Sequence, residues 1–126
     1  MSRSLLATAA VAVLCLTAAA PAAAQPARLV VQLYSFGFAP RPIHLAAGRP
    51  VTLTFVNQSS VGHDFTARTF FANARITAGA APQGEIELSG HQSRSITLTP
   101  RAGTYEAHCS HFLHKQMGMT DRIVVN

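Results

Sequence analysis

Short stretches of alternating apolar and polar residues are the feature of this sequence that most constrains its fold. In segment 51–55, three large apolar side chains alternate with threonines, which is the period-two pattern of a strand with one buried face. Similar segments recur at intervals of about 8–12 residues, separated by glycine, proline or polar clusters. They are 29–34, 43–45, 51–55, 86–88, 96–98, 103–109 and 122–125. This spacing predicts an all-β protein, built as a β-sandwich or barrel.

One segment departs from the strand pattern. Residues 69–78 contain two phenylalanines and several alanines, a composition that suits a short helix better than a strand. No internal repeat or linker follows residue 28. We therefore expect a single β domain with one short helix.

The N-terminus has the composition of an export signal. Arg3 supplies a positive charge, segment 5–20 is uncharged and mainly apolar, and segment 22–24 offers small residues at a cleavage point. We expect residues 1–24 to be a signal peptide and residues 25–126 to be the mature, periplasmic domain. An uncleaved membrane anchor is the alternative, although the apolar stretch is short for a membrane span.

The charged residues exclude one class of partner. The chain has ten Lys and Arg against five Asp and Glu, but the basic residues occur singly, without a basic run or stripe. This distribution argues against nucleic-acid binding. We expect a monomer that does not insert stably into a membrane.

Removal of residues 1–24 would leave Cys109 as the only cysteine. An exported protein with one thiol cannot form an internal disulfide, and a free thiol is a liability in an oxidising compartment. The thiol must therefore be buried, paired between chains, or occupied by a ligand. The residues around it favour a ligand.

Soft sulfur and imidazole donors gather near the C-terminus. Four residues separate Cys109 from His114 and four more separate His114 from Met119, while His63 lies far upstream. A thiolate, two imidazoles and a weak axial thioether suit one copper ion that cycles between Cu(I) and Cu(II). A structural zinc site would carry four Cys or His ligands and would need no methionine. We therefore expect a mononuclear copper site.

Two neighbours compete for these positions. His111 is an alternative to His114, but one residue between it and Cys109 leaves little chain to wrap around an ion. Met117 is an alternative to Met119, which is favoured by its spacing and by the adjoining Gly118. We expect His114 and Met119 to be the ligands.

Three segments carry a resemblance to a known family. They are an apolar strand–turn–strand opening, a Gly-His-Asp-Phe segment, and a Gly-Thr-Tyr segment that leads into the sulfur-containing loop and a final apolar strand. The segments are 38–57, 62–65 and 103–125. Together they resemble the cupredoxins, the blue-copper family of plastocyanin, azurin and rusticyanin, across nearly all of the expected mature chain. The loop is longer than plastocyanin's and is most similar to rusticyanin's.

The resemblance implies a Greek-key β-sandwich with copper at one end and electron transfer, rather than catalysis, as the activity. The implied ligands are His63, Cys109, His114 and Met119. The expected function is that of an exported mononuclear blue-copper electron-transfer protein. The alternative is a periplasmic copper-binding protein for copper trafficking or resistance, because the loop is dense in histidine and methionine.

The chain departs from the family pattern at two positions. Asp64 stands where the family commonly has an asparagine that braces the ligand loop, here through Ser110. A carboxylate can accept such a hydrogen bond but cannot donate one, so the sequence does not decide whether Asp64 braces the loop. His108 precedes the cysteine where plastocyanins have a tyrosine, and strand alternation places its side chain on the surface.

The remaining predictions concern surface residues, namely two histidines and two apolar residues. His44 and His91 are expected on the surface. Phe112 and Leu113 immediately precede His114, in a loop that cannot bury every side chain it carries. Exposed apolar residues beside a redox centre make a small docking patch for transient encounters with redox partner proteins.

Overall fold

The computed structural model describes residues 13–22 and 25–126. Arg3 and the expected cleavage point after Ala24 lie outside these residues. In the described part of the chain, no helix is both long and apolar enough to cross a membrane. The elements, in order, are β1 (Ala27–Tyr34), β2 (Gly37–Ala39), β3 (Ile43–Leu45), β4 (Val51–Asn57), β5 (His63–Thr66), α1 (Arg68–Asn73), β6 (Arg75–Ala78), a 3₁₀ turn (Pro82–Gly84), β7 (Glu85–Leu88), β8 (Ser93–Thr99), β9 (Gly103–His108) and β10 (Thr120–Val125).

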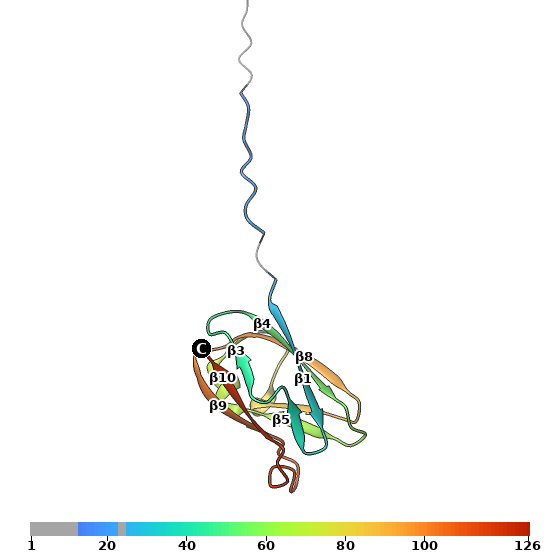
Figure 1. Ribbon diagram of the computed structural model, residues 1–126. Coiled ribbons are helices and arrows are strands. Elements are labelled where there is room, and N and C mark those ends of the chain that lie inside the picture. The colour runs from blue at the N-terminus through green and yellow to red at the C-terminus, as the bar shows by residue number, and fades with distance from the viewer. Residues whose placement is uncertain (1–12, 23–24) are drawn as a thin grey trace, which may run out of the picture.

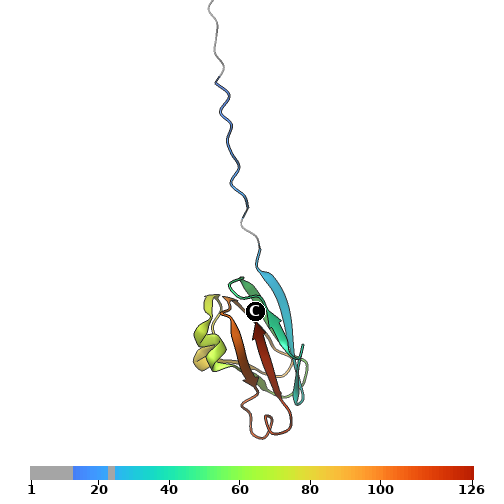
Figure 2. The same ribbon diagram turned by 60° about the vertical axis from the view of Figure 1, so that its left-hand side comes forward.

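The strands form two sheets, in the orders β2-β1-β4-β8-β6 and β3-β10-β9-β5-β7. The β1–β4 and β3–β10 pairs are parallel and the other pairs are antiparallel. Sheet neighbours are often distant in sequence, which is the consequence of Greek-key connections between two layers. The all-β sandwich with one short helix, predicted from the sequence, is confirmed. The loop between β9 and β10 projects from the opposite end of the sandwich from Ala27, where β1 begins (Figures 1 and 2).

The core lies between the two sheets and is built by strand alternation. In β4, Val51, Leu53 and Phe55 point inward and are buried, as their spacing predicts. Phe55 and Phe38 each pack against Phe65 from the other sheet, at ring-centroid distances of 4.8 and 5.3 Å. Aromatic pairs of this kind stabilise a core beyond the apolar area they bury.

The prediction for residues 69–78 is wrong in its second half. Helix α1 ends at Asn73, and the next residue has extended backbone angles. Residues Arg75–Ala78 then form β6, which pairs with the outer edge of β8. Phe70 and Phe71 are buried and hold the helix against the sandwich, whereas β6 is exposed along its length. Backbone pairing with β8 thus decides the conformation of β6. Because the side chains of β6 are exposed, the segment shows no apolar periodicity in the sequence.

A second strand has no counterpart among the predicted segments. His63–Thr66 forms β5, which lies between β7 and β9. All four of its residues are buried, on both faces of the strand. A short strand with polar residues and two covered faces shows no alternation, and this one positions the first expected metal ligand.

Candidate metal centre

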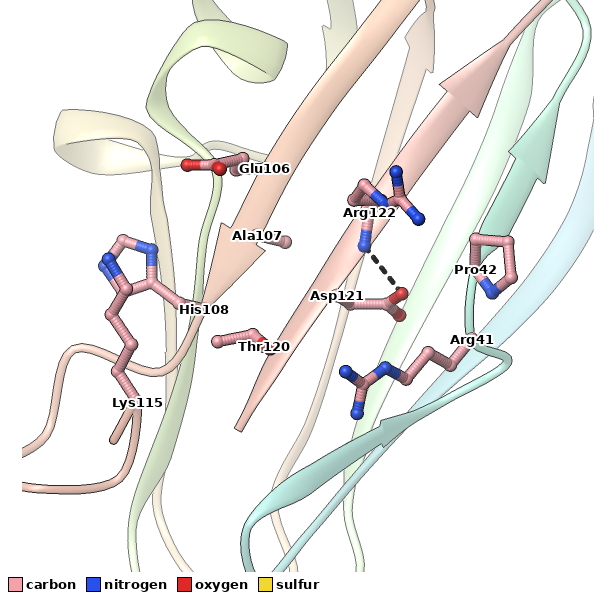
Figure 3. A pocket seen from close by; sticks show the side chains of 9 residues that line it. All are labelled: Arg41, Pro42, Glu106, Ala107, His108, Lys115, Thr120, Asp121 and Arg122. Atoms are coloured by element: carbon pink, nitrogen blue, oxygen red, sulfur yellow. Dashed lines mark hydrogen bonds between the residues drawn. The ribbon is translucent and has the colours of Figure 1, made fainter. Parts of the chain in front are cut away.

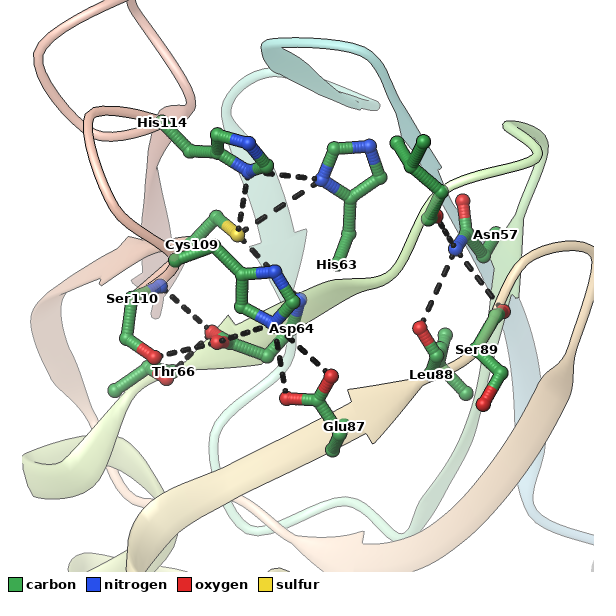
Figure 4. A network of polar contacts seen from close by, with 12 residues as sticks. Asn57, His63, Asp64, Thr66, Glu87, Leu88, Ser89, Cys109, Ser110 and His114 are labelled. Atoms are coloured by element: carbon green, nitrogen blue, oxygen red, sulfur yellow. Dashed lines mark hydrogen bonds and ion pairs between the residues drawn. The ribbon is translucent and has the colours of Figure 1, made fainter.

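His63 is positioned by a fixed turn that joins β4 to β5. The side chain of Asn57, at the end of β4, donates to the carbonyl of Val61 at 2.8 Å and to that of Ser89 at 3.1 Å. Its Oδ1 accepts the backbone N–H of Ser59 at 3.0 Å. These bonds tie the turn to the end of β7 (Figure 4). His63, the first residue of β5, therefore has a defined place at this end of the sandwich.

The segment from Cys109 to Met119, which we call the ligand loop, is closed by main-chain hydrogen bonds. The N–H of Cys109 donates to the carbonyl of Met119 at 3.1 Å, and the N–H of Met119 donates to the carbonyl of His114 at 3.0 Å. Within the loop, the N–H of Met117 donates to the carbonyl of Leu113 at 3.1 Å. The expected ligands of the loop are thus linked directly through the backbone.

Three expected ligands converge. Nδ1 of His114 lies 3.2 Å from Nδ1 of His63 and 3.4 Å from Sγ of Cys109, and the Cys109 sulfur lies 3.9 Å from Nδ1 of His63 (Figure 4). His63 and Cys109 are buried and His114 is half-buried. Nitrogen and sulfur ligands bound at about 2.0–2.3 Å to one ion lie roughly 3–4 Å from one another. The spacing of these donors therefore fits a single metal ion.

The fourth expected ligand is distinguished by burial. Met119 is fully buried at the end of the ligand loop, whereas Met117 is 57% exposed. A buried thioether at the end of this loop can act as a weak axial donor, beside two imidazoles and a thiolate. Burial therefore favours Met119 over Met117 for this position.

Burial also shapes the protonation of the donors. The pKa of His63 is lowered by burial first and then by the neighbouring imidazoles of His114 and His111, which favours the neutral, metal-binding form. Burial raises the pKa of the Cys109 thiol, while the backbone N–H groups of Asp64 and His111 oppose that shift. A buried thiol between two imidazoles is suited to exchange its proton for a soft cation.

His111 has different contacts. Its Nε2 lies 3.0 Å from Oε1 of Glu87 on β7 and 3.6 Å from Oδ2 of Asp64. A ring nitrogen of His111 also lies within 4.8 Å of the Cys109 sulfur. Nδ1 of His114 lies 3.4 Å from that sulfur and 3.2 Å from Nδ1 of His63, so the geometry favours His114 as the second imidazole ligand.

Asp64 does brace the ligand loop. Its carboxylate accepts the backbone N–H of Ser110 at 2.9 Å and the Ser110 hydroxyl at 2.5 Å, and it also accepts the Thr66 hydroxyl at 2.7 Å. The N–H of Asp64 points to the sulfur of Cys109 at 3.5 Å. All the required donors belong to other residues, so a carboxylate serves here as well as an amide.

Phe36, which lies in the turn between β1 and β2, is a site neighbour that the sequence did not reveal. Its ring meets that of His114 edge-to-face, with centroids 5.3 Å apart. The turn and the ligand loop are far apart in the sequence, and neither contains a motif that links them. Their contact arises from the packing of the two sheets.

The hollow in Figure 3 is separate from the donor cluster. It has a volume of about 570 Å³ and lies against the outer face of β9 and β10, lined among others by Arg41, Lys115 and Arg122. His108 lines it and is half-buried there, whereas His44 and His91 are exposed as expected. Burial first, and then Lys115, lowers the pKa of His108. None of the four expected ligands lines this hollow.

Comparisons with known proteins agree with the fold. A family model described as a cupredoxin-like domain matches residues 5–125. No curated protein matches the chain.

Several solved structures resemble it. Auracyanin B is 24% identical with a TM-score of 0.58, over 82% of this chain and 92% of that protein. Reduced auracyanin from Roseiflexus castenholzii is 17% identical with a TM-score of 0.62, over 82% and 99%. Auracyanin A from Chloroflexus aurantiacus, described as a "blue" copper protein, is 20% identical with a TM-score of 0.56, over 79% and 99%. At these identities the likeness establishes a shared fold.

Proposed function

Because the chain belongs to the cupredoxin-like domain family, we propose that it is a mononuclear blue-copper protein that transfers electrons, with one copper ion as its cofactor. The observation that carries this proposal is the convergence of one thiol sulfur and two imidazole nitrogens within 3.9 Å at one end of the sandwich. In this proposal His63, Cys109 and His114 are the strong ligands and Met119 is the weak axial ligand. Bound copper supplies a one-electron couple between Cu(I) and Cu(II).

The protein contributes rigidity. His63 is held by β5, and the ligand loop is closed by main-chain bonds to Cys109 and Met119. Side chains fixed in this way keep nearly the same positions in both oxidation states, so little has to rearrange when an electron arrives or leaves. Burial of Cys109 and Met119 keeps water away from the sulfur donors.

The same geometry indicates where electrons enter and leave. His114 is the half-buried ligand, and the ring of Phe36 packs against it at nearly a right angle. Phe112 is 88% exposed and Leu113 is 49% exposed in the same loop. We propose that Phe112 and Leu113 form a small apolar patch on which redox partner proteins dock transiently. The protein is then an electron carrier rather than an enzyme.

Copper trafficking is the second candidate function. It is favoured by the exposure of Met117, a soft Cu(I) donor that lies in the ligand loop outside the buried cluster. For either function we propose periplasmic localisation, with residues 1–24 removed after export.

One experiment separates these functions. Cu(II) is added to the chain that begins at Gln25, and the visible spectrum and a voltammogram are recorded. An intense thiolate-to-copper band with reversible one-electron cycling supports electron transfer. A colourless protein that binds only Cu(I) and yields it readily to a chelator supports trafficking. A chain that binds no copper contradicts both.

A further inference from the structure

Asp64 is a fully buried carboxylate beside the donor cluster. Its side chain is 0% exposed, and its backbone N–H lies 3.5 Å from the Cys109 sulfur. The hydrogen bonds to its carboxylate come from Ser110 and Thr66. These donors are neutral, so they stabilise the negative charge without cancelling it.

Cationic side chains do little to neutralise this charge. In the part of the chain that the structure describes, no Lys or Arg lies within ion-pair distance of Asp64. Among the described residues, His111 is the one imidazole within ion-pair distance of Asp64, at 3.6 Å, and its ring nitrogen lies closer to Glu87, at 3.0 Å. Carboxylate oxygens of Glu85 and Glu87 lie within 4.8 Å of an oxygen of Asp64.

Most of the acidic residues of the chain lie together around Asp64. Three of the five acidic residues in the sequence are gathered here, although the chain as a whole is basic. Burial raises the pKa of Glu85, as do the negative charges of Asp64 and Glu87, while Arg68 opposes them. The cluster thus gathers three carboxylates beside one arginine and one histidine.

This charge acts on the ligands. The backbone N–H of Asp64 lies 3.5 Å from the Cys109 sulfur, and Asp64 directly follows His63 in β5. A buried negative charge so close to these donors favours the more positive state of a metal held by them.

From this arrangement we propose that the Asp64 carboxylate lowers the reduction potential of the copper centre by stabilising Cu(II) relative to Cu(I), with Glu87 adding to the effect. The inference rests on the proposed copper function. It assigns Asp64 a second role besides bracing the ligand loop, and this role is one that an asparagine at the same position would not perform. Asp64 is thus a residue that tunes the potential through its charge.

The test compares an isosteric neutral variant with a truncated one. Asp64→Asn keeps an acceptor for the Ser110 N–H and removes the charge, whereas Asp64→Ala removes both. Reduction potentials of the copper-loaded chain from Gln25 are measured by voltammetry, with the visible spectrum and the unfolding midpoint of the apoprotein as further readouts. Glu106→Gln, at an exposed carboxylate on β9, is the matched control for loss of one negative charge.

We expect Asp64→Asn to raise the potential while retaining the thiolate-to-copper band, and Glu106→Gln to shift it less. An unchanged potential in Asp64→Asn overturns the inference. So does a shift found only in Asp64→Ala together with a changed spectrum and a lower apoprotein midpoint, because the brace alone would then matter.

A second pair covers the case in which Asp64→Asn does not fold or load copper. Glu87 is exposed, and Glu87→Gln should raise the potential more than Glu106→Gln does. Equal shifts in this pair count against the inference. Failure of the proposed function itself looks different, since the unsubstituted protein would then show no thiolate band or no reversible couple.

Discussion

The backbone N–H of Cys109 donates a hydrogen bond to the carbonyl oxygen of Met119 across 3.1 Å, and this bond joins the two ends of the ligand loop. The N–H of Met119 in turn binds the carbonyl of His114. Main-chain bonds therefore link a strong sulfur ligand, the axial thioether and an imidazole in the proposed site. Because side-chain substitutions leave these bonds in place, single variants in the loop test ligand chemistry separately from loop closure.

Cys109→Ser should abolish the intense thiolate-to-copper band and leave a folded sandwich. A serine hydroxyl is a poor ligand for copper, while the core depends on the buried aliphatic and aromatic residues of both sheets. Visible absorption and far-ultraviolet circular dichroism measure the two effects. A coloured Cys109→Ser variant would show that the sulfur is not a ligand.

Met119→Leu should retain copper and colour but raise the reduction potential. An axial thioether donates weakly to Cu(II), and an alkyl side chain of similar volume removes that donation. Met117→Leu is the matched control because Met117 is exposed, and its potential should stay close to that of the unsubstituted protein. A potential that responds to Met117 and ignores Met119 would reverse the choice of axial ligand.

Asn57→Ala should destabilise the apoprotein by about 1–3 kcal/mol, because it removes several hydrogen bonds that one buried side chain makes to main-chain groups. Asn57 is buried and holds the carbonyls of Val61 and Ser89 as well as the N–H of Ser59. Denaturant unfolding gives the free-energy change. Ser60→Ala, at an exposed position in the same turn, serves as the control, and equal losses in the two variants would contradict the role given to Asn57.

Leu113→Glu should slow electron exchange with a partner protein roughly tenfold, the equivalent of about 1.4 kcal/mol in a docking equilibrium. The reason is that a charge in the proposed apolar patch must be desolvated when the partner docks. Phe112→Glu should behave in the same way, with little change in absorption or potential. Stopped-flow exchange kinetics provide the measurement. Large spectral changes with unaltered kinetics would mean that these residues line the copper site instead.

The sequence predicted the strands that show alternation and the donor set that clusters in one loop. Leu53 and Phe55 are readable because one face of β4 is buried and the other is not. β5 has no predicted counterpart because it is covered on both faces, and Arg75–Ala78 is predicted as helix because only its pairing with β8 makes it a strand. Short strands of this kind are specified by their neighbours rather than by their own residues.

The surroundings of the site were less predictable than its donors. Spacing favours His114 over His111 and Met119 over Met117; in the structure His114 lies 3.4 Å from the Cys109 sulfur and Met119 is buried. The contact of Phe36 with His114, and that of Glu87 with His111, join segments with no shared motif. The sequence alone does not decide whether Asp64 braces the ligand loop, because that depends on where the Ser110 N–H and hydroxyl point.

The complete burial of Cys109 has a practical consequence. In a chain that begins at Gln25 this is the only thiol, and a water-soluble alkylating reagent reaches it only when the ligand loop separates from the sandwich. The rate of alkylation of the apoprotein therefore reports how often this end of the molecule opens. Compared with the rate for the denatured chain, it yields a local opening free energy for the loop.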